Sequence, residues 1–216
     1  EKNSCSSTGR VIWNKKSNGY FYLKKNPKTL IANTLFFHKL GTDPKKDRLV
    51  YKEKDKQFNL SISLSRTKKY LFLEISKTES NETWFLDLDE ENIHIRCFLK
   101  RKNNHLYYID DTPENFFILS NRDNKKNFAL YKTSFNKLTL RNWIEVIPHN
   151  KNELIEDFLC FKDFIILGIR KNGLSQLVQV SKKSKKKIYI NFKDEAHTVK
   201  LSHNNSYDSK NLSFAY

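Results

Sequence analysis

The chain is poor in the residues that mark several protein classes. It has 216 residues but only five glycines and four prolines, and no apolar run approaches the roughly 18 residues of a membrane helix. Collagen-like and membrane-spanning classes are therefore excluded. Its three cysteines (Cys5, Cys97 and Cys160) are far apart and form no CxxC pair, so neither a disulfide framework nor a zinc ribbon is indicated. We expect a reducing, cytoplasmic location.

Methionine is absent altogether, and the chain opens at Glu1 without a visible signal peptide. We therefore expect the native start to be missing and the sequence to be a piece of a longer protein. Aromatic residues make up 13% of the chain and charged residues 30%. That aromatic content is too high for a disordered polymer, so the chain is expected to fold.

The charge balance is strongly basic. Lysine and arginine total 40 against 24 acidic residues, a net charge of +16, which raises nucleic acid or an acidic surface as partners. However, there are 32 lysines and only 8 arginines, together with 23 asparagines. Phosphate and base recognition favours the bidentate arginine fork, so we do not expect a nucleic-acid partner and we expect the lysines on solvated edges.

Aromatic runs recur along the whole chain at a nearly constant spacing. They begin at Tyr20, Tyr70, Phe116, Phe164 and Leu212, with spacings of 50, 46, 48 and 48 residues. Three further sets of short apolar runs keep this period, which gives each repeat four strands. Four short antiparallel strands at this period are typical of β-propeller blades, because each blade buries its faces against its neighbours.

The repeat predicts an all-β fold, a partial β-propeller with four four-stranded antiparallel blades and the start of a fifth. The expected blades cover residues 10–53, 59–99, 106–147 and 154–192, and residues 198–216 supply two strands of a fifth. Hairpin turns are expected at residues 17–19, 65–69, 112–115, 161–163 and 204–211, and all four prolines fall between strands. Tandem β-sandwiches, the alternative, do not repeat a four-strand unit at this period.

No catalytic constellation is visible. The GxSxG motif of α/β-hydrolases is missing, and residues 168–175 (GIRKNGLS) place Leu174 where a phosphate-binding loop needs lysine, so a hairpin is expected there. The six histidines lack metal-ligand spacing: His38, His94, His105, His149, His197 and His203. We therefore predict no catalytic, metal-binding or cofactor-binding residue and no cofactor.

Charged clusters are interpreted as solvated strand ends and turns. The acidic pairs are Asp87 with Asp89, Glu90 with Glu91, and Asp110 with Asp111. The strongest basic run is residues 182–187 (KKSKKK), and a solvated turn is the favoured interpretation there.

Several strings resemble the oligopeptidase B (protease II) branch of the prolyl oligopeptidase family. They are residues 48–89 (beginning RLVYKEKDKQFNLSISLS), 98–133 (beginning FLKRKNNHLYYIDD) and 143–180 (beginning WIEVIPHNKNELIEDF), and residues 12–40 resemble the preceding blade. Family-like elements are residues 53–55, Arg101 and Lys102 followed by His105 and Tyr107, residues 121–128, and Glu156 with Gly173 and Leu174.

The resemblance implies a parent protein in which a seven-bladed propeller covers an α/β-hydrolase domain with a Ser, Asp, His triad and cleaves short peptides after Lys or Arg. This chain corresponds to about the third to sixth blades and the beginning of the seventh. The catalytic domain is then absent from this chain, and the propeller limits substrate size. Because a charge of +16 repels basic peptides, carboxylates of the catalytic domain are expected to recognise the Lys or Arg side chain.

Two functions remain open from the sequence. The first is a non-catalytic propeller segment of such a serine endopeptidase, with its own catalytic domain as partner and short basic peptides as the parent's substrates. The second is a stand-alone propeller-like scaffold that binds an acidic protein or nucleic-acid partner through lysine-rich edges. Neither involves a membrane, and exposed blade edges also predict self-association.

Overall fold

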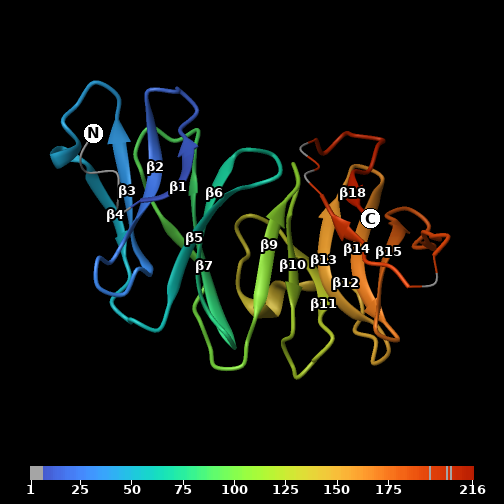
Figure 1. Ribbon diagram of the computed structural model, residues 1–216. Coiled ribbons are helices and arrows are strands. Elements are labelled where there is room, and N and C mark those ends of the chain that lie inside the picture. Colours follow the sequence, from blue (N-terminus) through green and yellow to red (C-terminus); the bar gives the residue numbers. More distant parts are fainter. Residues whose placement is uncertain (1–6, 195, 203, 205) are drawn as a thin grey trace. The chain divides into compact units, whose positions relative to one another are not determined.

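The computed structural model describes residues 7–194, 196–202, 204 and 206–216, which consist of strands, turns and short 3₁₀ helices (Figure 1). The chain divides into two compact units, residues 1–105 and 106–216. In the described part the helices are two single 3₁₀ turns, η2 (Pro44–Lys46) and η3 (Leu140–Asn142). Within these residues no helix is long and apolar enough to cross a membrane.

The first unit contains two four-stranded antiparallel sheets. One sheet has the order β1-β2-β3-β4 and the other the order β5-β6-β7-β8, so neighbouring strands are always consecutive in the chain. The bounds are β1 (Ser7–Trp13), β2 (Gly19–Lys25), β3 (Ala32–Lys39), β4 (Arg48–Lys52), β5 (Asn59–Leu64), β6 (Tyr70–Lys77), β7 (Ser80–Asp87) and β8 (Arg96–Leu99).

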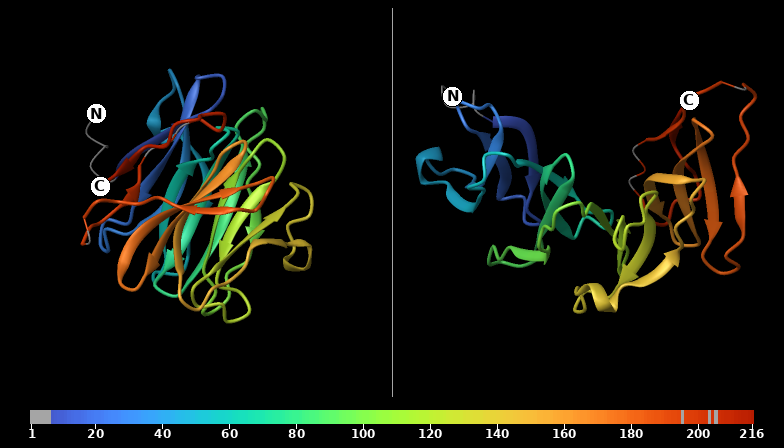
Figure 2. Two further views of the ribbon diagram at one scale, coloured as in Figure 1. Left: turned by 90° about the vertical axis from the view of Figure 1, so that its right-hand side faces the viewer. Right: turned by 90° about the horizontal axis from the view of Figure 1, so that it is seen from below.

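The second unit contains two more sheets of the same topology and a two-stranded sheet. The bounds are β9 (Tyr107–Asp111), β10 (Phe116–Ser120), β11 (Ala129–Thr133), β12 (Ile144–Ile147), β13 (Leu154–Cys160), β14 (Phe164–Lys171), β15 (Leu174–Ser181), β16 (Lys187–Tyr189), β17 (Lys200–Leu201) and β18 (Phe214–Ala215). Figure 2 shows that the sheets of both units are twisted, as strands of L-residues require. The four meandering sheets and the further pair confirm the predicted fold class.

The hairpin at residues 168–175 and the positions of the prolines agree with the expectations from the sequence. Residues 168–175 form the β14–β15 hairpin, in which Lys171 pairs with Leu174. Asn172 and Gly173 between them have φ of 51° and 81°, the positive values that a two-residue hairpin turn needs. All four prolines lie outside strands, where the missing N–H costs no ladder hydrogen bond. One strand is shorter than its apolar run predicts, since β16 ends at Tyr189.

The core of the first unit lies between its two sheets. In β5 buried and exposed residues alternate, so Leu60 and Ile62 point inward and Ser61 does not. They join Phe21, Leu35 and other side chains of the first sheet in one apolar cluster. Strand β6 differs, because residues on both of its faces are buried. Such a strand is a near-continuous apolar run, which is how YLFLEI reads in the sequence.

The second unit has two apolar clusters. The larger one joins side chains of β10, β11 and β12 to those of β13, β14 and β15, including Leu119, Leu130 and Leu167. The smaller one places Ile166 and Leu177 against Val199 and, from β17, the partly buried Leu201. Consecutive sheets in this unit therefore share apolar faces, which is how repeats that cannot bury a face alone gain stability.

A β-bulge recurs where the third strand of a sheet pairs with the fourth. The register shifts between Leu35 and Phe36, between Thr83 and Trp84, and between Leu130 and Tyr131. In each case the fourth strand carries one extra residue, and these residues, Val50, Phe98 and Val146, lie 48 residues apart. A bulge increases local twist. In three of the four sheets the repeat therefore extends to a bulge in the fourth strand, which the apolar pattern did not reveal, whereas β15 and β16 pair without a shift.

Candidate functional site: a latch and a cleft in the first unit

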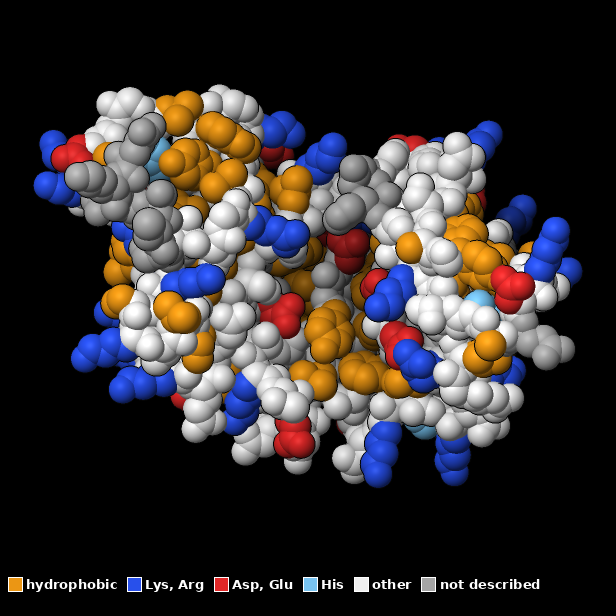
Figure 3. Space-filling model, in the orientation of Figure 1, with side chains coloured by type: hydrophobic (Ala, Val, Ile, Leu, Met, Phe, Trp, Pro, Cys, Tyr) orange, Lys and Arg blue, Asp and Glu red, His pale blue; other side chains and the backbone are white. Residues whose placement is uncertain are grey.

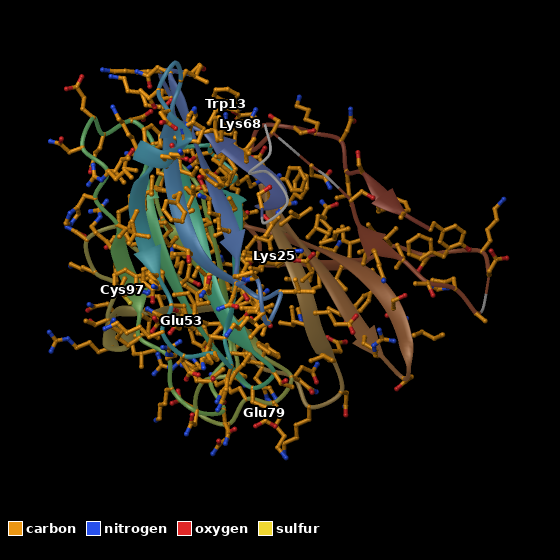
Figure 4. The ribbon with its side chains drawn as sticks, turned by 60° about the vertical axis from the view of Figure 1, so that its left-hand side comes forward. Trp13, Lys25, Glu53, Lys68, Glu79 and Cys97 are labelled. Atoms are coloured by element: carbon orange, nitrogen blue, oxygen red, sulfur yellow. The ribbon has the colours of Figure 1, made fainter. Side chains whose placement is uncertain are left out.

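The two ends of the sheets in the first unit carry different groups. Strands β1 and β5 run toward one end and β2 and β6 return to the other, since each pair is antiparallel. Figure 4 places Trp13 and Lys68 near one end and Glu79 at the opposite end. Glu53, which follows β4, lies toward the same end as Glu79.

Glu53 is the first residue of the link between the two sheets and is only 5% exposed. Its Oε1 accepts hydrogen bonds from the backbone N–H groups of Lys54 and Asp55, both at 2.8 Å. Its Oε2 accepts one from the Tyr51 hydroxyl at 3.3 Å. The carboxylate therefore folds back on its own loop and fixes the start of the link.

Arg101, which follows β8, completes this arrangement. Its guanidinium donates from Nη1 to Oε2 of Glu53 at 3.0 Å and from Nη2 to Oε1 at 3.2 Å. It also lies 4.0 Å from the centre of the Phe58 ring. This bidentate pair joins the beginning of the link to the end of the following sheet, and we call Glu53, Phe58, Glu82 and Arg101 the latch.

Glu82 in β7 connects the latch to the sheet interior. Its Oε2 accepts the backbone N–H of Arg101 at 3.1 Å, and its Oε1 accepts Nε1 of Trp84 at 2.9 Å. Burial by itself raises the pKa of Glu53, but the hydrogen bonds and charge of Arg101 and the two backbone donors hold it below its usual value. Glu53 is an ionised, fully engaged acceptor, so it is a structural group and not a general base.

The positions of Glu53 and Arg101 within the repeat are a sequence signal for the latch that local motifs do not reveal. Glu53 and Arg101 are 48 residues apart, which is the repeat period. Each stands three positions after the extra residue of a bulge, Val50 or Phe98. Equivalent positions of consecutive repeats therefore carry opposite charges. The next equivalent position is occupied by His149.

A cleft of about 440 Å³ opens at the other end of the same two sheets. Its apolar surface comes from Phe21, Phe37, Leu86, Leu88 and Ile93, and asparagine and threonine side chains lie at its edges. Basic side chains from the first sheet and its loops line it, namely Lys16, Lys39, Lys46 and Arg48. Acidic side chains from the end of β7 and the loop after it also line it, namely Asp87, Asp89, Glu90 and Glu91.

The loop that carries Lys46 is fixed by a buried carboxylate. The side chain of Asp47 is 3% exposed and accepts the Tyr22 hydroxyl at 2.5 Å. Its other oxygen lies 2.7 Å from Nδ1 of His38. Burial, together with the hydrogen bond to Asp47, raises the pKa of Tyr22 above its usual value, so its hydroxyl stays a donor. The loop that carries Lys46 is therefore fixed to the first sheet through His38 and Tyr22.

The family-like residues of the second unit are also architectural. In the turn at residues 121–128, Oδ1 of Asn121 accepts the Leu106 N–H at 2.8 Å. Nδ2 of Asn127 donates to the carbonyls of Asn150 and Lys151, at 3.0 and 2.8 Å. These bonds tie the β10–β11 connection to the segments before β9 and β13.

Two further family-like groups also make structural contacts. Nε of Arg170 donates to Oε1 of Glu156 at 2.8 Å, and its Nη1 donates to the Gly173 carbonyl at 3.3 Å, which braces the β14–β15 hairpin. Tyr107 is fully buried, and its ring centre lies 6.2 Å from that of Trp143. His105 is also buried, whereas Lys102 is exposed.

Two expectations about charged clusters need correction. Asp111 stands at the end of β9 but is 1% exposed, so it is not on a solvated edge. Lys182 begins the basic run at residues 182–187, yet it is half-buried, with Nζ 3.3 Å from the Tyr207 hydroxyl and 5.5 Å from the centre of the Phe117 ring. Its aliphatic stem packs while its amine reaches polar groups. Lys183, Lys185 and Lys186 are exposed, as expected.

The cysteines and histidines are dispersed. Burial raises the pKa of half-buried Cys97 to about 11, so its thiol is protonated at neutral pH, and Cys160 is buried. Cys5 and His203 lie outside the described residues. Among the residues that the structure describes, no group of three or more His, Cys, Asp or Glu side chains is arranged to hold a metal ion.

Comparison with known proteins identifies the source of these features. The sequence model of the family described as "Prolyl oligopeptidase, N-terminal beta-propeller domain" matches residues 2–216. The chain is 25% identical over 206 residues to dipeptidyl aminopeptidase BI of Pseudoxanthomonas mexicana, covering 95% of this chain and 28% of that protein. It is 27% identical over 182 residues to Protease 2 of Moraxella lacunata, covering 84% and 26%. The chain thus spans about a quarter of the length of these relatives.

Solved structures show the same fold. Oligopeptidase B from Leishmania major superimposes with a TM-score of 0.89 at 18% identity, over 97% of this chain and 30% of that one. Oligopeptidase B from Trypanosoma brucei, with covalently bound antipain, gives 0.88 at 21% identity, over 97% and 31%. The tandem-sandwich alternative is thereby excluded. The chain belongs to the prolyl oligopeptidase family, as part of its N-terminal β-propeller domain.

Proposed function

We propose that the chain is a non-catalytic propeller segment of an oligopeptidase B-like serine endopeptidase. The observation that carries this proposal is the match of the family's propeller domain to residues 2–216, combined with coverage of about a quarter of its relatives. Protease 2 and oligopeptidase B are among the similar proteins. On this proposal a Ser, Asp, His triad lies in a separate α/β-hydrolase domain of a seven-bladed parent, which works in the cytoplasm.

The role proposed for the segment is to wall off the active site and limit substrate size. A cavity closed by a propeller admits short peptides and excludes folded proteins, and domain opening controls entry. The latch supports this role, because it ties consecutive sheets together with a bidentate ion pair whose carboxylate is buried. The proposed substrates are short peptides cleaved after Lys or Arg, whose basic side chain is recognised by carboxylates outside this strongly basic chain.

The outer face of the first sheet supports a larger propeller. Opposite the shared core it presents Val11 and Trp13, which are 45% and 47% exposed, beside the half-buried rings of Tyr20, Tyr22 and Phe36. Both faces of β6 in the second sheet are buried by contrast. An apolar sheet face of this kind is stable when another sheet covers it, and a further blade of the parent is the proposed cover.

The reading frame around the coding sequence is the first test. A downstream segment with GxSxG and a following Asp and His supports the proposal, and a frame without a hydrolase domain contradicts it. The isolated 216-residue chain is expected to show no turnover of Arg- or Lys-ester reporters. Turnover that survives repurification and treatment with a serine-reactive inhibitor would also contradict the assignment of a non-catalytic segment.

A second candidate function is a scaffold that binds an acidic partner through lysine-rich edges. The observation in its favour is the excess of lysine and arginine over acidic side chains, visible across the face in Figure 3, with exposed Lys183, Lys185 and Lys186 in one turn. Salt-sensitive binding of poly-glutamate that a triple Lys→Gln variant of this turn abolishes would favour it. Light scattering tests the predicted self-association through blade edges, and a monomer at high concentration would contradict that prediction.

A further inference from the structure

The acidic side chains around the cleft of the first unit are paired with basic ones, but not all of its basic side chains are paired. Each of its four acidic side chains lies within ion-pair distance of a basic one: Asp87 with Lys69, Asp89 with Lys15, Glu90 with Arg96, and Glu91 with Lys16. The carboxylates of the cleft are therefore already neutralised locally, and a cationic ligand finds no free partner among them.

The basic side chains of the cleft are used unequally. Lys16 pairs with Glu91, and Nη2 of Arg48 donates to the Ile93 carbonyl at 3.0 Å. Lys39 and Lys46 have no side-chain hydrogen bond or ion pair with any residue that the structure describes. Lys39, Lys46 and Arg48 thus have no carboxylate partner among the described residues, and the ammonium groups of Lys39 and Lys46 remain to compensate an anion.

The apolar surface between these charges restricts the kind of anion. The half-buried Phe37 and Ile93 form the accessible part of a hydrophobic floor, and Phe21, Leu86 and Leu88 are buried beneath it, with the ring centres of Phe21 and Phe37 4.9 Å apart. A bare phosphate leaves this floor uncovered, whereas an anion attached to an apolar group uses both features. A volume of about 440 Å³ lies in the range of small-molecule sites and suits two or three amino-acid residues.

The cleft is also held open by its surroundings. Gly19 allows the Phe37 ring to lie where a Cβ would stand 2.4 Å from Cζ, so the floor depends on a glycine at this position. Asp47 anchors the loop that carries Lys46 through His38 and Tyr22. Little reorganisation is then needed on binding, which lowers its entropic cost.

We propose that this cleft binds the carboxyl terminus of a short peptide whose last residue is apolar or aromatic. The terminal carboxylate pairs with Lys39 and Lys46, and the last side chain covers Phe37 and Ile93. Asn14, Asn18 and Thr42 also line the cleft, but Asn14 Nδ2 donates to Asn18 Oδ1 and Thr42 Oγ1 donates to the Lys39 carbonyl, so the carboxylate and the last side chain carry the binding. This binding is a property of the first unit and is independent of the proposed peptidase function.

Isothermal titration of the 216-residue chain with acetyl-Ala-Ala-Phe, and with the same peptide as its carboxyl-terminal amide, tests the proposal. The acid is expected to bind at least tenfold more tightly than the amide. The variant Lys39→Gln/Lys46→Gln is expected to remove that difference. The matched control Lys45→Gln/Lys68→Gln removes the same charge outside the cleft and is expected to keep affinity within about twofold.

Three results would overturn the proposal. Equal binding of acid and amide, or no binding of either at millimolar concentration, removes the carboxylate site. A control variant that loses as much affinity as Lys39→Gln/Lys46→Gln reduces the effect to net charge. Octanoate that binds as tightly as the peptide assigns the cleft to aliphatic carboxylates in general. Circular dichroism of each variant verifies that the fold is retained, so a loss of binding reports on the site.

Discussion

The two ends of the first unit are built from the same strands but use charge in opposite ways. At the latch, Glu53 receives five hydrogen bonds and its cationic partner is bidentate. At the cleft, three of the four ion pairs join exposed side chains, and Lys39 and Lys46 remain uncompensated among the described residues. The repeat sets the backbone at both ends of these sheets. The loops at each end determine whether a charged side chain is paired within the fold or is available to a ligand.

Removing the cation of the latch has the largest expected effect. Arg101→Ala leaves the Glu53 carboxylate buried without its bidentate partner, which we expect to lower the free energy of unfolding by about 2–3 kcal/mol. Urea denaturation followed by tryptophan fluorescence measures this loss. The matched change at the cleft, Lys16→Ala, removes an exposed cation and is expected to leave the urea midpoint unchanged within error. Equal losses of unfolding free energy in the two variants would contradict the difference described between the latch and the cleft.

Overpacking the cleft end is the next largest effect. In Gly19→Ala the new Cβ would lie 2.4 Å from Cζ of Phe37 and 2.5 Å from the His38 carbonyl oxygen, so the backbone must shift. We expect a loss of about 2 kcal/mol in unfolding free energy. Gly173→Ala meets no atom within 4 Å but sits at a φ of +81°, for which about 1 kcal/mol is expected. If Gly19→Ala loses less unfolding free energy than Gly173→Ala, the Phe37 ring and the backbone near Gly19 adapt to the added methyl group, which would contradict the expected overpacking.

The pH dependence of stability sharpens the comparison with the smallest expected effect. The folded-state pKa of Glu53 is lowered, so its contribution is present above the unfolded pKa and is lost as pH falls through the folded pKa. The thermal stability of the wild type relative to Glu53→Gln is therefore expected to decrease between about pH 5 and pH 3.

Glu74 in β6 supplies the control of opposite sign. Burial raises its folded-state pKa, so the stability contributed by its protonated form is lost as pH rises through that pKa. The free energy of unfolding of the wild type, relative to that of Glu74→Gln, is then expected to be highest at acid pH and to decrease toward neutral pH. Parallel pH profiles for the two variants would contradict the opposite environments assigned to these carboxyl groups.

Local patterns predicted the strands and turns because they depend on neighbouring residues alone. The period of the aromatic runs predicted the four-stranded units, and Leu174 in place of the phosphate-loop lysine favoured a hairpin at residues 168–175. The candidate site could not be read in this way. Asp111 and Lys182 follow ordinary edge and turn patterns, yet one is buried and the other packs against rings of Phe117 and Tyr207.

The sequence by itself determined the repeat, the all-β class and the family resemblance, since each is written in the spacing and identity of residues along the chain. Only the tertiary structure decided that Glu53 meets Arg101 one period away, and that the acidic residues of the cleft are paired while two of its lysines are not. The physical reason is that ion pairing and burial depend on which loops converge at a sheet end, and that convergence follows from sheet packing.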